Sequence, residues 1–375
     1  MCGACVVPSH AAETAVPSLH TFAHDSTGRF LALAEGCTVT PLTSVLIVDD
    51  EKPIRELLAR WVQSLNLQAW MAASAEEAVA ELNAHHCDLA IIDIMMPGKN
   101  GLWLADELRR NHPEVAVVLS TGNAATIDDT PSAIADLLIK PYKRERFVLA
   151  VDRGRDWRRQ TAEEQERQTH LMSRVHARVA DLRAEIAQGR RAGHDESDIL
   201  WQIAVAHLPD VVEHCERVER YTASIARELN VDARSIELFE RAARFHDIGK
   251  LAMPESVLAK PSPLTRGDIA IMRAHVDAGV DILLAASQLR DTAAIVKASH
   301  EWFNGRGYPA GLAGCDIPLA SRIISVADAY DAMTQDRRYR TRLDAAEAIS
   351  ELLRGAPTQF DPDVVVAFLN IVNRH

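Results

Sequence analysis

Short apolar runs alternate with helical periodicity from Ser44 onward. The continuous apolar run 45–48 predicts a strand, and the apolar residues that follow, from Ile54 to Leu65, recur at three- and four-residue spacing, as in a helix. The same alternation predicts further strands at 67–72, 89–94, 115–120 and 137–139, and further helices at 75–84, 101–111 and from 144 onward. Five short apolar strands alternating with helices indicate a parallel sheet covered on both faces.

A long polar helix is predicted over residues 153–193, which are rich in Arg, Glu, Gln and Ala. Its apolar stripe consists of Leu171, Val175, Val179, Leu182 and Ile186. A stripe this narrow suits either a short coiled coil, and hence a homodimer, or packing on a neighbouring element. The helix is expected to couple the two domains, and the pattern leaves both forms of packing open.

The remaining sequence separates into a leader and an all-helical region. Residues 1–43 have no clear periodicity, and we expect a poorly ordered leader. From about Ser197 to His375 the pattern is almost entirely helical. The expected organisation is therefore a leader (1–43), an α/β domain (44–155), a helical linker (156–196) and an all-α domain (197–375).

Composition fits a multidomain globular protein. The chain has 375 residues, 47% of them hydrophobic and 25% charged, which excludes a wholly disordered chain. No uninterrupted apolar run is long enough for a membrane span, and no export signal is visible, so we expect a cytoplasmic protein. The net charge of −12 argues against DNA as a partner. The six cysteines are expected to be reduced thiols.

Polar residues stand where the predicted strands end. Asp49 and Asp50 follow the first strand, Asp93 ends the third, Thr121 follows the fourth and Lys140 the fifth. Strand ends at one edge of a parallel sheet converge, and neighbouring carboxylates repel one another unless a cation joins them. Carboxylate oxygens suit Mg²⁺. A carboxylate can also attack a phosphoryl group, whose charge an ammonium and a hydroxyl would stabilise.

This set of five residues resembles the receiver domain of two-component response regulators, over roughly residues 44–155. The resemblance implies a flavodoxin-like sheet, phosphorylation of Asp93, Mg²⁺ held by Asp49, Asp50 and Asp93, and switch roles for Thr121 and Lys140. The phosphoryl donor would be a sensor histidine kinase. The sequence departs from the family at Leu137, where an aromatic residue is frequent, and in the short segment before Lys140, which contains Pro131.

A second group of candidate ligands lies in the all-α domain. His246 and Asp247 are adjacent, and we expect both on one helix over 239–251. The other candidates are His214, His275, His300 and Asp328, with Asp210 one helical turn before His214. Mixed His and carboxylate ligands suit Fe, Mn, Ni or Zn. With a carboxylate available to bridge, a two-metal site that activates water and holds phosphoester oxygens is expected.

The context of these residues resembles the HD-GYP family of cyclic di-GMP phosphodiesterases. The shared motifs are His246-Asp-Ile-Gly-Lys250, His300-Glu-Trp-Phe-Asn-Gly305-Arg-Gly-Tyr308-Pro309-Ala-Gly311-Leu312, Ile317-Pro318, Ala327-Asp328-Ala-Tyr-Asp331-Ala332, Asp336-Arg337-Arg-Tyr339 and Phe360-Asp361-Pro362. They are independent of one another and extend over about 170 residues.

The resemblance implies a role for each matched residue. One metal would be held by His214, His246, Asp247 and Asp328, and Asp247 would bridge to a second metal completed by His275 and His300. Asp247 and Lys250 would be catalytic, Lys250 would meet a substrate phosphate, and Gly307, Tyr308 and Pro309 would line the substrate cleft and dock partner proteins such as diguanylate cyclases. Asp210 stands where some members place a carboxylate for a third metal.

Three positions depart from the family pattern. Ser299 replaces a histidine that usually precedes His300, so the second metal loses a ligand. Asn304 replaces a usual aspartate, and Trp302 a common basic residue.

We therefore predict a response regulator whose output domain hydrolyses cyclic di-GMP. The alternative is a catalytically weakened domain that binds cyclic di-GMP or a protein. A third interpretation, hydrolysis of another nucleotide, is disfavoured by the Gly-Tyr-Pro loop.

Overall fold

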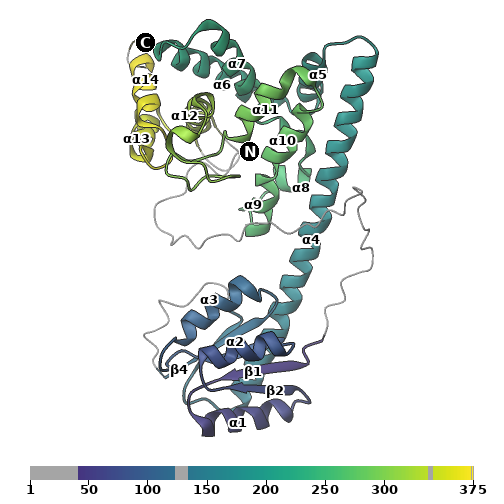
Figure 1. Cartoon of the computed structure of the whole chain (residues 1–375), viewed down its shortest axis with the longest axis vertical. Coiled ribbons are helices and arrows are strands. Elements are labelled where there is room, and N and C mark those ends of the chain that lie inside the picture. Colours follow the sequence, from purple (N-terminus) through teal and green to yellow (C-terminus); the bar gives the residue numbers. More distant parts are fainter. Residues whose placement is uncertain (1–40, 123–133, 337–340, 373, 375) are drawn as a thin grey trace. The chain divides into compact units, whose positions relative to one another are not determined.

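The computed structural model describes residues 41–122, 134–336, 341–372 and 374 (Figure 1). Most of the expected leader, residues 1–40, and Pro131 lie outside them. The described chain divides into two compact units, with the division in the sequence between Arg167 and Gln168.

A five-stranded parallel sheet forms the centre of the first unit. Its strands are β1 (Ser44–Val48), β2 (Gln68–Ala72), β3 (Leu89–Asp93), β4 (Ala116–Thr121) and β5 (Asp136–Ile139). They are arranged in the order β2-β1-β3-β4-β5, which is the flavodoxin-like order. The expected parallel sheet is confirmed, and each predicted strand agrees with the structure to within one residue at either end.

Helices cover both faces of this sheet. They are α1 (Lys52–Gln63), α2 (Ala75–Ala84), α3 (Gly101–Asn111) and the first part of α4 (Arg144–Arg191). Successive strand residues face opposite sides, so Ile47 and Ile91 pack with α1 and α4 while Leu46 and Ile92 pack with α2 and α3. Both faces are apolar, which is why the strands read as continuous hydrophobic runs.

Helix α4 is a single helix of 48 residues, where the sequence suggested a receiver helix followed by a separate linker. Ion pairs join its first part to the start of two strands. Arg146 and Arg153 pair with Asp136, at 2.5 and 2.7 Å, and Arg158 pairs with Asp88 at 2.6 Å. Both aspartates are buried at the edge of the sheet opposite the predicted phosphorylation site.

The second unit is helical, as expected. After the second part of α4 come α5 (Glu196–His207), α6 (Pro209–Glu228), α7 (Ala233–Phe245), α8 (Glu255–Leu258), α9 (Arg266–Arg273), α10 (His275–Leu283), α11 (Arg290–Lys297), α12 (Leu319–Thr334), α13 (Ala345–Gly355) and α14 (Pro362–Val372). Short 3-10 helices are η2 (Ile248–Ala252), η3 (Ser287–Leu289) and η4 (Gly314–Asp316). None of the described helices is both long and apolar enough to cross a bilayer.

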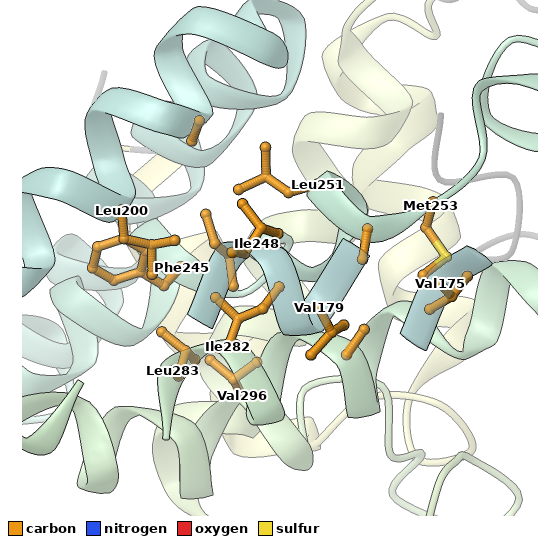
Figure 2. Packing of buried hydrophobic residues seen from close by; sticks show 14 of the residues in the cluster. Val175, Val179, Leu200, Phe245, Ile248, Leu251, Met253, Ile282, Leu283 and Val296 are labelled. Atoms are coloured by element: carbon orange, nitrogen blue, oxygen red, sulfur yellow. The ribbon is translucent and has the colours of Figure 1, made fainter. Parts of the chain in front are cut away.

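The apolar stripe on α4 is buried in the core of its own unit. All five stripe residues are at most 6% exposed. Figure 2 shows Val179 beside Ile282, and Val175 beside Met253, in the same core. The stripe therefore packs on neighbouring elements of the same chain, which is the second of the two forms of packing left open by the sequence, and a homodimer stays a prediction.

Candidate metal centre and phosphoacceptor site

The predicted phosphoacceptor site lies at the carboxyl ends of the parallel strands. Asp49 and Asp93 are buried, Asp50 is exposed, and a carboxylate oxygen from each lies within 4.8 Å of the others. The Lys140 ammonium donates to Asp49 Oδ2 at 2.7 Å and to Asp93 Oδ2 at 2.8 Å. Thr121 is fully buried at the end of β4, and its carbonyl accepts the Lys140 amide at 2.7 Å. All five predicted residues are thus brought together.

Charge and burial compete at this site. Burial raises the pKa of the Asp93 carboxyl above its usual value, and the neighbouring Asp49 adds to this while Lys140 opposes it. Burial also lowers the pKa of the Lys140 ammonium, but its hydrogen bonds to Asp49 and Asp93 outweigh that effect and raise the pKa. Lysine therefore stays charged between the two carboxylates, where it would balance a phosphoryl group.

In the second unit, His246 and Asp247 lie at a helix end. Helix α7 stops at Phe245, His246 caps it, and Asp247 precedes η2. The expectation that both stand within one helix was wrong. Because the helix ends here, the side chains of His246 and Asp247 can lie next to metal-ligand candidates from other elements.

Gly249 allows η2 to pack directly on α10. A Cβ atom at this position would lie 1.8 Å from the main-chain oxygen of His275. Only glycine permits so close an approach of the two backbones. The glycine in the His-Asp motif is therefore a packing requirement that brings Asp247 next to His275.

Asp247 lies between two groups of ligands and is fully buried. Its Oδ2 is 3.8 Å from His214 Nε2 and 3.6 Å from His246 Nε2. Its Oδ1 is 3.5 Å from His275 Nε2. Each oxygen of one carboxylate thus faces different histidines, which is the arrangement of a bridging ligand.

The remaining ligand candidates complete two clusters. His214, His246 and Asp328 form one, and Asp247, His275 and His300 form the other, each with ligand atoms within 4.8 Å of one another. All are buried. The six predicted metal-ligating residues of this unit are therefore brought together.

The imidazoles of His246 and His275 are oriented by main-chain carbonyls. His246 Nδ1 donates to Ala243 O, and His275 Nδ1 donates to Met272 O, both at 2.7 Å. A carbonyl can only accept, so the proton must be on Nδ1 and the lone pair on Nε2. Both Nε2 atoms face Asp247, and the buried Nε2 of His246 makes no hydrogen bond to any described residue.

The electrostatics differ between the histidines of the two clusters. Burial alone would lower the pKa of His214, but the neighbouring Asp328 and Asp331 carboxylates outweigh it and raise the pKa. Burial lowers the pKa of His275 to about 3 and that of His300 to about 4. Burial alone would raise the pKa of Asp247, but the neighbouring positive charges, the Lys250 ammonium first among them, outweigh it and hold the pKa well below its usual range. His275 Nε2 and His300 Nε2 are 3.1 Å apart. Neutral imidazoles and carboxylates are the protonation states that bind a divalent cation, so these residues fit a metal centre.

Lys250 is buried and forms an ion pair with Asp247 Oδ2. It lies in η2, three residues after Asp247, so the short helix places its ammonium against the carboxylate. The predicted cation is therefore present beside the ligands.

The Gly-Tyr-Pro loop lies against His300. The Tyr308 ring is stacked on the His300 imidazole, with centroids 5.1 Å apart and planes at 4°, and Arg273 lies over Tyr308 at 4.8 Å. A Cβ atom at Gly307 would lie 2.1 Å from the Trp302 amide nitrogen, so this glycine is also needed for close packing. Pro309 is exposed at the loop surface.

The departures from the family have different structural consequences. The Ser299 hydroxyl donates a hydrogen bond to the main-chain oxygen of Val296 in α11, at 2.8 Å. Asn304 Oδ1 accepts the Arg306 amide at 3.0 Å and forms a turn, which an aspartate would also form. Asp210 is exposed on α6 and is in neither cluster.

Sequence reasoning missed Glu301 and Cys215. The buried carboxylate of Glu301 accepts the amides of Ala310, Gly311 and Leu312, at 2.7, 3.0 and 3.1 Å, and so holds the loop. Cys215 Sγ is 3.8 Å from His246 Nδ1. Glu301 follows His300 directly in the motif, which was a usable signal, whereas nothing in the sequence distinguished Cys215.

The comparisons with known proteins agree with this geometry. Residues 45–152 match the response regulator receiver domain, and residues 198–364 match the HD domain. The chain is 29% identical over 343 residues to the cyclic di-GMP phosphodiesterase response regulator RpfG of Xanthomonas campestris pv. campestris, covering 87% of each chain. It is 28% identical over 340 residues to a cyclic di-GMP phosphodiesterase of Thermotoga maritima, covering 88% of this chain and 90% of that one.

Among solved structures, the response regulator TrrA of Thermotoga maritima, in complex with Mg²⁺ and BeF, is 31% identical. It covers 30% of this chain and 98% of its own, with a TM-score of 0.29. The receiver match precedes the HD match in this chain, and the two relatives each match most of it. The chain is therefore a two-component response regulator in which a receiver domain is followed by an HD domain of the HD-GYP type.

Proposed function

We propose that the HD domain hydrolyses cyclic di-GMP with a two-metal centre and that phosphorylation of Asp93 regulates this activity. The observation that carries the proposal is the position of the Asp247 carboxylate, which has His214 and His246 on one side and His275 on the other. The names of the relatives support the substrate, since they include cyclic di-GMP phosphodiesterases that match most of this chain.

The metal centre would be held by six residues. His214, His246, Asp247 and Asp328 would hold one ion, and Asp247, His275 and His300 the other. Imidazole and carboxylate ligands favour Fe, Mn, Ni or Zn. When bound, such ions activate water and neutralise phosphoester charge.

The chain's own residues supply position and charge. Lys250 offers an ammonium beside Asp247, which offsets part of the charge of an anionic substrate on an acidic protein. The Tyr308 ring, which is stacked on His300, would form an aromatic wall of the substrate cleft next to this proposed metal-ligating histidine. Gly307 and Pro309 shape the same loop, which we also propose as the surface for partner proteins such as diguanylate cyclases.

In the receiver, Asp93 would take a phosphoryl group from a sensor histidine kinase, with Mg²⁺ held by Asp49, Asp50 and Asp93. Lys140 already contacts both buried carboxylates, and Thr121 ends the neighbouring strand. We place the protein in the cytoplasm, where its proposed kinase and cyclic dinucleotide partners are found.

One observation favours a catalytically weakened domain that binds cyclic di-GMP or a protein. The Ser299 hydroxyl is directed to a backbone carbonyl and adds nothing to the second cluster. That cluster therefore has two histidines and the bridging carboxylate.

Turnover of cyclic di-GMP, measured with Mn²⁺ or Fe²⁺ on the full chain, tests the proposal. Asp247→Ala should abolish hydrolysis and metal binding because it removes the bridge. Asp281→Ala, which changes an exposed carboxylate on α10 outside both clusters, is the control and should keep the wild-type rate. Binding of cyclic di-GMP without turnover at saturating metal would favour the binding module instead.

The receiver assignment has a separate test. Acetyl phosphate with Mg²⁺ should label the wild type and leave Asp93→Asn unlabelled. Asp106→Asn, an exposed change on α3, should label normally. Equal labelling of wild type and Asp93→Asn would remove Asp93 as the acceptor.

A further inference from the structure

His214 differs from the other oriented histidines of the cluster. His246 and His275 donate their Nδ1 protons to carbonyls three residues earlier in the chain. His214 is within helix α6, and its Nδ1 donates instead to a side chain, Asp331 Oδ2 on α12, at 2.7 Å. The acceptor that orients this imidazole therefore comes from another helix, 117 residues away in the sequence.

Asp331 is itself held in place by an arginine. Arg217 donates from Nε to Asp331 Oδ1 at 2.6 Å and from an Nη atom to Oδ2 at 3.0 Å, a two-point contact with the planar carboxylate. Asp331 is 1% exposed. Arg217 is less than one turn after His214 on α6, so one helix presents both the imidazole and the guanidinium to the same carboxylate.

The Asp331 carboxylate accepts hydrogen bonds from both His214 and Arg217, so it is held on two sides. A carboxylate that accepts a hydrogen bond from the Nδ1–H group leaves the Nε2 lone pair of the same ring available. It also raises the basicity of that imidazole. His214 Nε2 lies 3.1 Å from Asp328 Oδ1 and 3.8 Å from Asp247 Oδ2, inside the first cluster.

We propose that Asp331, held by Arg217, is a positioning residue of the metal centre: it fixes the ring of His214 so that Nε2 points at the first metal position. The inference rests on the proposed function, because it requires that position to bind a cation. It assigns Asp331 a role through His214, and it gives Arg217 a part in metal affinity through its hydrogen bonds to Asp331.

Metal titration of the chelator-stripped full chain tests this inference. Mn²⁺ affinity and stoichiometry would be measured for the wild type, Asp331→Asn and Arg217→Lys. Asp331→Asn should weaken Mn²⁺ binding by about 10–100-fold, the usual effect of losing a partner of a metal-ligating histidine. Arg217→Lys should weaken it in the same direction by less, because the carboxylate remains but loses its two-point contact.

Asp361→Asn is the matched control. Asp361 is also buried and paired with an arginine, Arg322, and it belongs to neither ligand cluster. Both Asp→Asn changes should lower the thermal stability of the metal-free chain, whereas only Asp331→Asn should lower Mn²⁺ affinity.

Three results would count against the inference. If Asp331→Asn binds Mn²⁺ with the affinity of the wild type, the inference is overturned and the proposed function is not affected. If that variant does not fold, the same result in Arg217→Lys has the same meaning. An equal loss of affinity in Asp361→Asn would show a general structural effect and overturn it too. Failure of the wild type to bind Mn²⁺ would overturn the proposed function together with this inference.

Discussion

At the scale of single residues, the direction of each side chain at the metal centre depends on where the neighbouring helix ends. The His-Asp pair, the other histidines and Asp328 could be found because their types and spacing are unusual together. That Asp247 faces two sides depends on where α7 ends, and the apolar periodicity of 239–251 continued past that point. The direction of the Ser299 hydroxyl likewise depends on the backbone of α11, which the sequence pattern does not specify.

Ser299→His should raise both the amount of metal bound and the rate of cyclic di-GMP hydrolysis. Among the described residues, the second cluster consists of His275, His300 and the proposed bridge Asp247, so an added imidazole would supply a further donor. Metal content after desalting and turnover at fixed Mn²⁺ would measure the change.

Ser299→Ala is the control for this substitution. It removes the hydrogen bond to Val296 O, worth about 0.5–1.5 kcal/mol of stability, and adds no ligand. Its metal content should equal that of the wild type. If Ser299→His binds no additional metal, the missing histidine does not limit the site.

At the scale of elements, strands and short helices agreed with their predicted ranges, whereas α4 did not. Local periodicity correctly predicted helix on both sides of residue 153. Whether two helical segments join into one helix depends on whether a residue between them breaks the helix, and no glycine or proline marks a clear break here. The stripe from Leu171 to Ile186 had the spacing of a coiled coil, yet packs inside its own unit. Spacing shows that a face is buried and leaves the partner undetermined.

Leu182→Ala should destabilise the second unit by about 2–5 kcal/mol, because Leu182 is fully buried and its truncation leaves a cavity. The loss of stability would be measured by urea denaturation, with hydrogen exchange in α6 and α10 as the probe of the second unit. Arg183→Ala, on the exposed side of the same helix, should have little effect. A changed oligomeric state with unchanged unfolding would instead support a seam between copies.

Asp136→Asn should reduce the stability of the first unit at neutral pH and have less effect at low pH. Burial alone would raise the pKa of Asp136, but hydrogen bonds from Arg146 and Arg153 outweigh it and lower the pKa. A carboxyl with a lowered folded-state pKa stabilises the fold above its unfolded pKa of about 3.9, and this contribution is lost as pH falls through the folded value.

Urea midpoints of the first unit at several pH values would test this. The difference between wild type and Asp136→Asn should shrink as the pH falls below about 4. A difference that stays constant with pH would mean that the lost hydrogen-bond geometry, and not the charge, carries the effect.

At the scale of the whole molecule, the succession of an α/β domain and an all-α domain was predictable because the two periodicities differ clearly. The proposed ligands come from α6, the α7–η2 junction, α10, α12 and the segment after α11, and only the folded chain shows their distances. The expected domain limits at 155 and 196 fall within or just after α4 and remain predictions, since a continuous helix has no local signal for a boundary.

Chelation of metal should destabilise the second unit selectively. An ion that binds only the folded state adds about 2.7 kcal/mol when its concentration is 100 times its dissociation constant. Hydrogen exchange should therefore rise in α6 and α10 after treatment with a chelator. Asp247→Ala should show no such difference between metal-loaded and chelated samples, and an equal rise there would assign the effect to another site.

The two-sided position of Asp247 determines which substitutions count as conservative in this domain. Asparagine has the same shape as aspartate but replaces one acceptor oxygen with an N–H donor group, so at position 247 it would serve one group of histidines and oppose a cation at the other. At position 304 a single oxygen forms the turn, and asparagine is a full substitute. We therefore expect the same Asp-to-Asn exchange to be silent in the loop and disabling at the proposed bridge, and a similarity score that treats the two alike would misclassify relatives of this protein.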